Sequence, residues 1–252
     1  MTAKKFWIVL STSILLLMGG CYYSGGIDIS DRKVVEVVQT LAVGTSVDGR
    51  AIECLVLGGG SDVVLLMSTI HGNENVGTPL LERMKVYLQN NSHFLQGRKV
   101  VIMPLVNPDG MANNARVNAH GIDLNRNFPA DNRIDNKKNG FEALSEPESV
   151  AVYNVINRYK PGRIVTMHQP LNCIDYDGPG LALAQRLAGY CDLPVKKLGS
   201  RPGSLGSYAG NVLEIPIITV EFPRSDSNLS DQQIWQKYYK MTLAAIVYPD
   251  EL

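Results

Sequence analysis

The sequence predicts one α/β domain, in which a mixed, mostly parallel central sheet carries helices on both faces. An apolar run at residues 63–70 is typical of a buried strand, and residues 163–167 form another strand-like run. Between them, residues 78–89 carry apolar side chains at helical spacing, so this segment is expected to pack on the sheet. Alternation of strands and helices along the chain indicates this architecture. The length of 252 residues suits a single domain of this kind.

The other elements follow from local patterns. Residues 34–43 and 50–57 are rich in β-forming residues and flank a turn at 47–50, which predicts a hairpin. Ser145 is the expected N-cap of a helix whose first turn contains Pro147. The remaining expected elements are strands at 98–105 and 215–221 and helices at 145–159, 181–190 and 231–246.

A long segment at residues 111–140 is rich in Asn, Asp and Gly and has little periodicity. Loops of this length inside a compact domain are usually functional. The whole chain has 24 basic and 24 acidic residues, so its net charge is zero. No run of like charge is present, and nothing in the charge pattern favours binding to nucleic acid.

The first 20 residues are typical of a secretory signal peptide rather than of a folded element. Lys4 and Lys5 precede a short apolar segment at 6–18, which is short for a transmembrane helix. Gly19 and Gly20 then precede Cys21, as at a bacterial lipoprotein cleavage site. An ordinary signal peptide, with Cys21 as a bystander, is the alternative.

These features predict three parts: a signal peptide at 1–20, a polar tether at 21–33, and the α/β domain at 34–252. Lipidation of Cys21 would anchor the protein to a membrane through acyl chains. The expected location is therefore the bacterial cell envelope, on the periplasmic side, after secretion across the inner membrane; which membrane holds the anchor is left open.

Three cysteines would remain in the mature chain, Cys54, Cys173 and Cys191. An odd number leaves at least one thiol unpaired in an oxidising compartment. A bridge between Cys173 and Cys191 stays open, because sequence does not give the distance between them. The three lack the spacing of zinc-binding cysteines and are not assigned to a metal.

A candidate metal site is formed by His71, Glu74 and His168. His71 and Glu74 follow the strand at 63–70, and His168 follows the strand at 163–167. Residues at several strand ends can converge on one point in an α/β fold. Two imidazoles and one carboxylate leave a coordination position for water, which is typical of a catalytic zinc site.

Several further motifs accompany this set. They are Asn107-Pro108-Asp109-Gly110, Arg116, the run from Gly121 to Pro129 that reads GIDLNRNFP, and the run from Thr219 to Pro223 that reads TVEFP. Together with His71, Glu74 and His168 they resemble the zinc metallocarboxypeptidase family, and within it the bacterial murein peptide amidase A group. The resemblance extends from about Ile52 to the last expected helix, although Asn73 stands where family members often have Asp.

The resemblance implies one zinc ion bound by His71, Glu74 and His168. It implies that Glu221 is the general base, which takes a proton from the attacking water and passes it to the leaving amine. Arg116 matches the arginine that stabilises the oxyanion of the reaction.

Substrate binding is implied for a second group of residues. Asn125 and Arg126 match the pair that binds the carboxylate of the substrate, since a guanidinium can do so bidentately. Tyr208 lies in the region where the family places a tyrosine, and both a lid and a packing role are open for it. Arg201 is a candidate for a second carboxylate, such as that of diaminopimelate.

The leading hypothesis is a zinc peptidase that cleaves the γ-D-glutamyl–diaminopimelate bond of murein peptides. One alternative is a carboxypeptidase that releases C-terminal residues from ordinary peptides. Another is an envelope lipoprotein that binds zinc without turnover. The oligomeric state is not predicted.

Overall fold

The computed structural model describes residues 39–252. The expected signal peptide at 1–20, the lipidation site Cys21, the tether at 21–33 and the first five residues of the domain, 34–38, lie outside the described residues. No helix in the described part of the chain has the combined length and apolar character that crossing a membrane requires.

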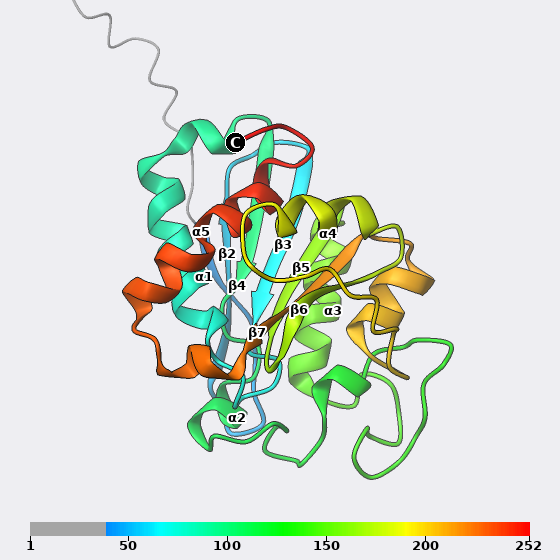
Figure 1. Ribbon diagram of the computed structural model, residues 1–252. Helices are drawn as coiled ribbons and strands as arrows, with labels where there is room; N and C mark the ends of the chain where they lie inside the picture. Colours follow the sequence, from blue (N-terminus) through cyan, green and yellow to red (C-terminus); the bar gives the residue numbers. More distant parts are fainter. Residues whose placement is uncertain (1–38) are drawn as a thin grey trace, which may run out of the picture. The chain divides into compact units, whose positions relative to one another are not determined.

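Seven strands form one sheet in the order β1-β2-β4-β3-β5-β7-β6 (Figure 1). Their bounds are β1 Gln39–Thr45, β2 Ala51–Leu57, β3 Asp62–Ser68, β4 Arg98–Met103, β5 Arg163–His168, β6 Leu171–Asp177 and β7 Ile217–Pro223. The four central strands β4, β3, β5 and β7 run parallel. At the edges β1 pairs antiparallel with β2, β2 with β4, and β6 with β7. The expected mixed, mostly parallel sheet is confirmed.

Helices cover both faces of this sheet (Figure 1). One face packs against α1 (Gly77–Asn90), α4 (Leu181–Ala188) and α5 (Asp231–Val247), and the other against α3 (Pro147–Tyr159). Successive residues of β3 alternate between these two cores, because side chains of a strand point to opposite faces. Burial on both faces explains why β3 contains the uninterrupted apolar run from Val63 to Met67, and every residue of β5 is buried as well.

The order of the central strands places a crevice at their carboxyl ends. From β3 the chain crosses through α1 to β4 on one side, whereas β5 lies on the other side of β3. Ligands of open α/β sheets bind outside the carboxyl ends of the strands at such a reversal. His71 follows β3, His168 is the last residue of β5, and Glu221 lies near the end of β7.

Asp109, from the Asn107–Gly110 motif, joins the first hairpin to the short helix α2 (Pro108–Ala112). Its fully buried carboxylate accepts hydrogen bonds from Ser46 Oγ at 2.8 Å, from the backbone N–H of Asp48 at 2.9 Å and from Arg50 Nη1 at 2.5 Å.

The loop that carries His71 is seated directly on α2. A Cβ atom at Gly72 would lie 1.9 Å from the carbonyl carbon of Gly110, so only glycine allows this approach. The Asn107–Gly110 motif therefore holds in place the loop that carries His71.

Two local predictions differ from the structure. Glu146, not Ser145, holds the N-cap position of α3, and Ser145 Oγ donates instead to Glu146 Oε1 at 2.9 Å. Pro147 is the first helical residue, so the chain enters the helix one residue later than a Ser145 cap requires. Strand β6 was not expected, because three of its seven residues are Asn or Asp.

Candidate active site

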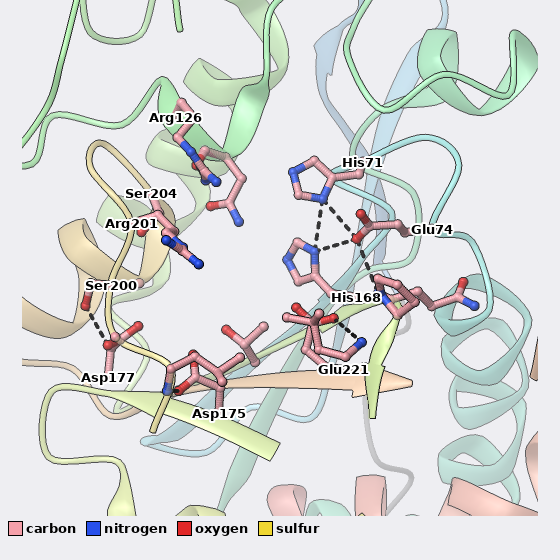
Figure 2. Close-up of a pocket in the computed structure, with 18 of the residues that line it drawn as sticks. His71, Glu74, Arg126, His168, Asp175, Asp177, Ser200, Arg201, Ser204 and Glu221 are labelled. Atoms are coloured by element: carbon pink, nitrogen blue, oxygen red, sulfur yellow. Dashed lines mark hydrogen bonds and ion pairs between the residues drawn. The ribbon is translucent and has the colours of Figure 1, made fainter. Parts of the chain in front are cut away.

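His71, Glu74 and His168 converge as the sequence predicts (Figure 2). Glu74 Oε2 lies 2.9 Å from His71 Nδ1 and 2.9 Å from His168 Nδ1, and the two ring nitrogens are 3.1 Å apart. All three residues are buried. Two imidazole nitrogens and one carboxylate oxygen facing a common point form the donor set of a catalytic zinc site, so these side chains fit the ion.

Asp123 fixes the orientation of His71. Asp123 Oδ1 lies 3.0 Å from His71 Nε2, so the other ring nitrogen, Nδ1, is the one that faces Glu74. A carboxylate on the far nitrogen of a metal-binding histidine sets the tautomer and raises the basicity of the ring. Burial alone would raise the pKa of Asp123, but its hydrogen bond with His71 and the nearby arginines hold it well below its usual value.

Arg116 lines the pocket and connects two of these carboxylates. It donates from Nη1 to Glu74 Oε1 at 2.7 Å and from Nε to Asp123 Oδ2 at 3.1 Å. Burial opposes ionisation of Glu74, yet its hydrogen bonds with His168 and His71 hold its pKa far below the usual value. The carboxylate is therefore ionised and available to a cation.

Glu221 lies beside this group. In the parallel pairing of β5 with β7 it is directly opposite His168, so the strand register brings it to the pocket. Its side chain is buried, and Oε2 accepts a hydrogen bond from the backbone N–H of Leu171 at 3.3 Å. Burial raises its pKa, against the opposing effect of His168. A carboxylate with a raised pKa is a better proton acceptor at neutral pH.

The opposite wall carries Asn125, Arg126 and Arg201, and Figure 2 shows both labelled arginines pointing into the cavity that the imidazoles also face. Asn125 Oδ1 accepts from the backbone N–H of Leu205 at 2.8 Å, which leaves its NH₂ group as the free donor. Burial lowers the pKa of Arg126, because it disfavours the charged guanidinium. A bound anion would compensate that buried positive charge.

The comparisons with known proteins agree with this geometry. The sequence model of the zinc carboxypeptidase family matches residues 30–176. The chain belongs to the zinc carboxypeptidase family. It is 34% identical to murein peptide amidase A of Escherichia coli strain K12 over 187 residues, which are 67% of this chain and 74% of that protein. It is 30% identical to mouse carboxypeptidase M over 180 residues, 60% of this chain and 39% of that protein.

Solved structures give the same result. The crystal structure of murein-tripeptide amidase MpaA from Escherichia coli O157 aligns with a TM-score of 0.67 and 28% identity, covering 87% of this chain and 97% of that one. Carboxypeptidase A from Helicoverpa armigera aligns with a TM-score of 0.70 at 20% identity, over 85% and 70% of the two chains, and shares the fold. The protein is thus a zinc metallopeptidase with a zinc carboxypeptidase fold, and zinc is its cofactor.

Tyr208 does not line the pocket of this zinc carboxypeptidase. Its side chain is only 5% exposed and stacks on Phe128, with ring centroids 6.3 Å apart. It lies in the π-helical turn Gly206–Val212, where Tyr153 packs against its ring. Of its two expected roles, packing agrees with this buried position, and contact of Tyr208 with substrate stays a prediction. The turn directs the ring into the core.

The cysteines take no part in this site. Cys54, Cys173 and Cys191 are all unpaired, so the bridge between Cys173 and Cys191 is not formed. Burial raises the pKa of Cys54 to about 12 and also raises the pKa of Cys173, which keeps both thiols protonated.

Gln169, Asp175 and Asp177 are among the pocket residues that the sequence analysis does not predict. The backbone N–H of Gln169 donates to Glu74 Oε2 at 3.2 Å and so helps to hold that carboxylate. Asp175 and Asp177 lie at alternate positions of β6. Their period-two spacing was the available signal, because it places both carboxylates on the same face of a strand.

Proposed function

We propose that the protein hydrolyses murein peptides at the γ-D-glutamyl–diaminopimelate bond, with zinc bound by His71, Glu74 and His168. The observation that carries the proposal is the convergence of these three side chains, with Glu221 beside them and with Arg126 and Arg201 on the opposite wall. The similarity to a murein peptide amidase over two thirds of the chain supports the substrate class.

In this mechanism Glu221 is the general base. A zinc ion in the site supplies Lewis-acid polarisation of the scissile carbonyl and lowers the pKa of the attacking water. Glu221 Oε2 is held by Leu171, so Oε1 is the oxygen that receives the proton from water. The same oxygen then donates that proton to the leaving amine, which completes cleavage without a second acid.

The other residues position the substrate and stabilise charge. The NH₂ group of Asn125 and the guanidinium of Arg126 bind the carboxylate of the residue being released. This contact places the bond to be cut between the zinc site and Glu221. Arg116, held by Glu74 and Asp123, stabilises the negative charge that develops on the carbonyl oxygen.

A carboxypeptidase that acts on ordinary peptides is the second candidate. The observation that favours it is the Asn125–Arg126 pair, which would accept any terminal carboxylate, and the chain is also similar to carboxypeptidase M. The third reading, a zinc-binding lipoprotein without turnover, uses the same site but needs neither Glu221 nor the arginines.

One assay separates these candidates. The purified protein is incubated with L-alanyl-γ-D-glutamyl-meso-diaminopimelate and, separately, with acyl-dipeptides of ordinary L-residues, and the products are read by mass spectrometry. Release of diaminopimelate, abolished by a chelator and restored by zinc, is the expected result. Faster cleavage of the acyl-dipeptides would favour the second candidate, and no cleavage of either set would favour the third.

We also propose that the protein acts in the bacterial cell envelope, anchored by lipid on Cys21. The support is the sequence alone, in which a basic start and an apolar segment precede Gly19-Gly20-Cys21. Murein lies in that compartment, so the location fits the proposed substrate.

A further inference from the structure

Beyond the zinc site, the pocket has a second charged region formed by β6, β7 and the loop after α4. Asp175 of β6 pairs with Thr219 of β7, and both residues line the cavity. Asp175 Oδ1 accepts from the backbone N–H of Leu198 at 2.8 Å, while Oδ2 has no hydrogen-bond partner among residues 39–252. Burial raises the pKa of Asp175. Because burial disfavours the uncompensated negative charge, an entering cation would stabilise the ionised carboxylate of Asp175.

Asp177, two residues further along, is a useful contrast. Its Oδ1 accepts from Lys197 Nζ at 3.0 Å and from Ser200 Oγ at 2.5 Å, so its charge is already compensated and it anchors the loop. Asp175 forms no ion pair within the described part of the chain. Of these two neighbouring acids, Asp175 is the one left for a ligand.

Arg201 lies in that loop, and hydrogen bonds hold its backbone. Its carbonyl oxygen accepts from the backbone N–H of Ser204 at 3.0 Å and from Ser207 Oγ at 2.7 Å. The guanidinium donates to no acceptor in residues 39–252 and points into the cavity in Figure 2. Arg201 also lowers the pKa of Arg126 by repulsion, after the larger effect of burial. Two repelling cations in one pocket favour a ligand with two carboxylates.

We infer that Asp175 and Arg201 recognise the two charges at the end of the released residue's side chain, its ammonium and its carboxylate respectively. This inference rests on the proposed function, in which Asn125 and Arg126 hold the other carboxylate of the same residue. The apolar side chains of Leu171 and Leu198, which also line the pocket, suit the methylene chain between the charged ends. The ligand class is a C-terminal α-amino acid whose side chain ends in a second amino-acid group.

The test uses three peptides that share the γ-D-glutamyl bond and differ in the last residue. Meso-diaminopimelate carries both side-chain charges, lysine carries the ammonium alone, and norleucine carries neither. The wild-type protein should show kcat/KM in the order diaminopimelate, lysine, norleucine. Arg201→Ala should reduce the diaminopimelate-to-lysine ratio about tenfold or more, mainly through KM, because a charge-assisted hydrogen bond is lost.

Asp175→Asn should reduce the lysine-to-norleucine ratio by a similar factor, about tenfold. Asparagine keeps the acceptor oxygen for Leu198, so the loop should stay in place, and an unchanged melting temperature would verify this. Arg158→Ala, on the exposed side of α3, is the matched control and should leave both ratios as they are.

The outcomes separate this inference from the proposed function. If the wild-type protein cleaves all three peptides equally, or if each variant lowers all three rates by the same factor, the recognition by Asp175 and Arg201 is wrong while the bond cleaved is right. If no γ-D-glutamyl peptide is cleaved, the proposed function is wrong. Acyl-dipeptides ending in the same three residues then measure the same ratios, and equal ratios in wild type and variants would overturn the inference as well.

Discussion

His168 and Glu221 are direct neighbours across two parallel strands, the last residue of β5 opposite the fifth residue of β7. Main-chain hydrogen bonding of the sheet, rather than a flexible loop, therefore sets the relation between a zinc-binding imidazole and the proposed general base. A base held on a rigid strand needs little reorganisation during reaction.

Replacement of Glu221 by Gln should leave zinc in place and remove hydrolysis. The amide keeps the shape of the side chain but accepts no proton, so kcat should fall about 10²- to 10⁴-fold. Zinc content by elemental analysis and turnover of the diaminopimelate tripeptide check both parts. Near-normal turnover in a zinc-loaded variant would contradict the assignment of Glu221 as base.

Replacement of Asp123 by Asn should weaken zinc binding. The carboxylate opposite His71 Nε2 orients the ring, and loss of such a partner typically lowers metal affinity about 10- to 100-fold. Competition with a chromogenic chelator measures the change. Asp131→Asn, exposed in the same long loop, is the control and should bind zinc like the wild type; equal affinity in both variants would show that Asp123 does not act through His71.

Replacement of Asp109 by Asn should make stability less dependent on acid pH. Burial would raise the pKa of Asp109, but hydrogen bonds from Asp48, Arg50 and Ser46 lower it below its usual value. A lowered pKa in the folded state means that the ionised group stabilises the fold above the unfolded-state pKa of about 3.9, and that this contribution is lost as pH falls below it.

Chemical denaturation at neutral pH and at about pH 3 gives the measurement for Asp109. The variant should be less stable by about 1–3 kcal/mol at neutral pH and should lose less stability on acidification. Glu53→Gln, at an exposed residue of β2, serves as control and should follow the wild type. A parallel loss of stability in wild type and Asp109→Asn would exclude the predicted linkage.

Substitutions of Tyr208 should separate packing from substrate contact. Tyr208→Ala removes a buried ring that stacks on Phe128 and should destabilise the protein by about 3–5 kcal/mol. Tyr208→Phe keeps the ring and should leave KM for the tripeptide unchanged, because the side chain does not line the pocket. A large rise in KM for the phenylalanine variant, with a normal melting temperature, would restore a substrate-binding role.

Replacement of Cys21 by Ala should release the protein from membranes. A lipid-modified cysteine partitions the protein into the membrane fraction through its acyl chains. Fractionation of cells that express the full chain, followed by detection of the protein, gives the distribution. Cys191→Ala should stay membrane-bound; equal fractionation of both variants would leave Cys21 a bystander.

The central strands and the zinc site were predictable from the sequence because their signals are local. Strands buried on both faces require continuous apolar runs, and polar side chains at the ends of such runs point to one edge of the sheet. The positions of His71, Glu74 and His168 at strand ends are therefore visible in the sequence itself.

The remaining pocket residues depend on tertiary contacts that leave weak local signals. Strand β6 has polar residues on the face toward the cavity, so it lacks the apolar pattern of a core strand. The inward turn of Tyr208 depends on a π-helical segment that sequence periodicity does not reveal. The cap of α3 depends on the position of Pro147, which moved the helix start by one residue.

The sequence separation of the site has a consequence for biosynthesis. Glu74 meets His168 across 94 positions of chain, and Glu221 arrives only with β7, the last strand to be synthesised. During synthesis from the amino end, the set of zinc ligands is therefore complete once His168 has been made, whereas the proposed proton acceptor Glu221 is added later, with β7. The proposed hydrolysis therefore requires that β7 has been made and has paired with β5 in the sheet.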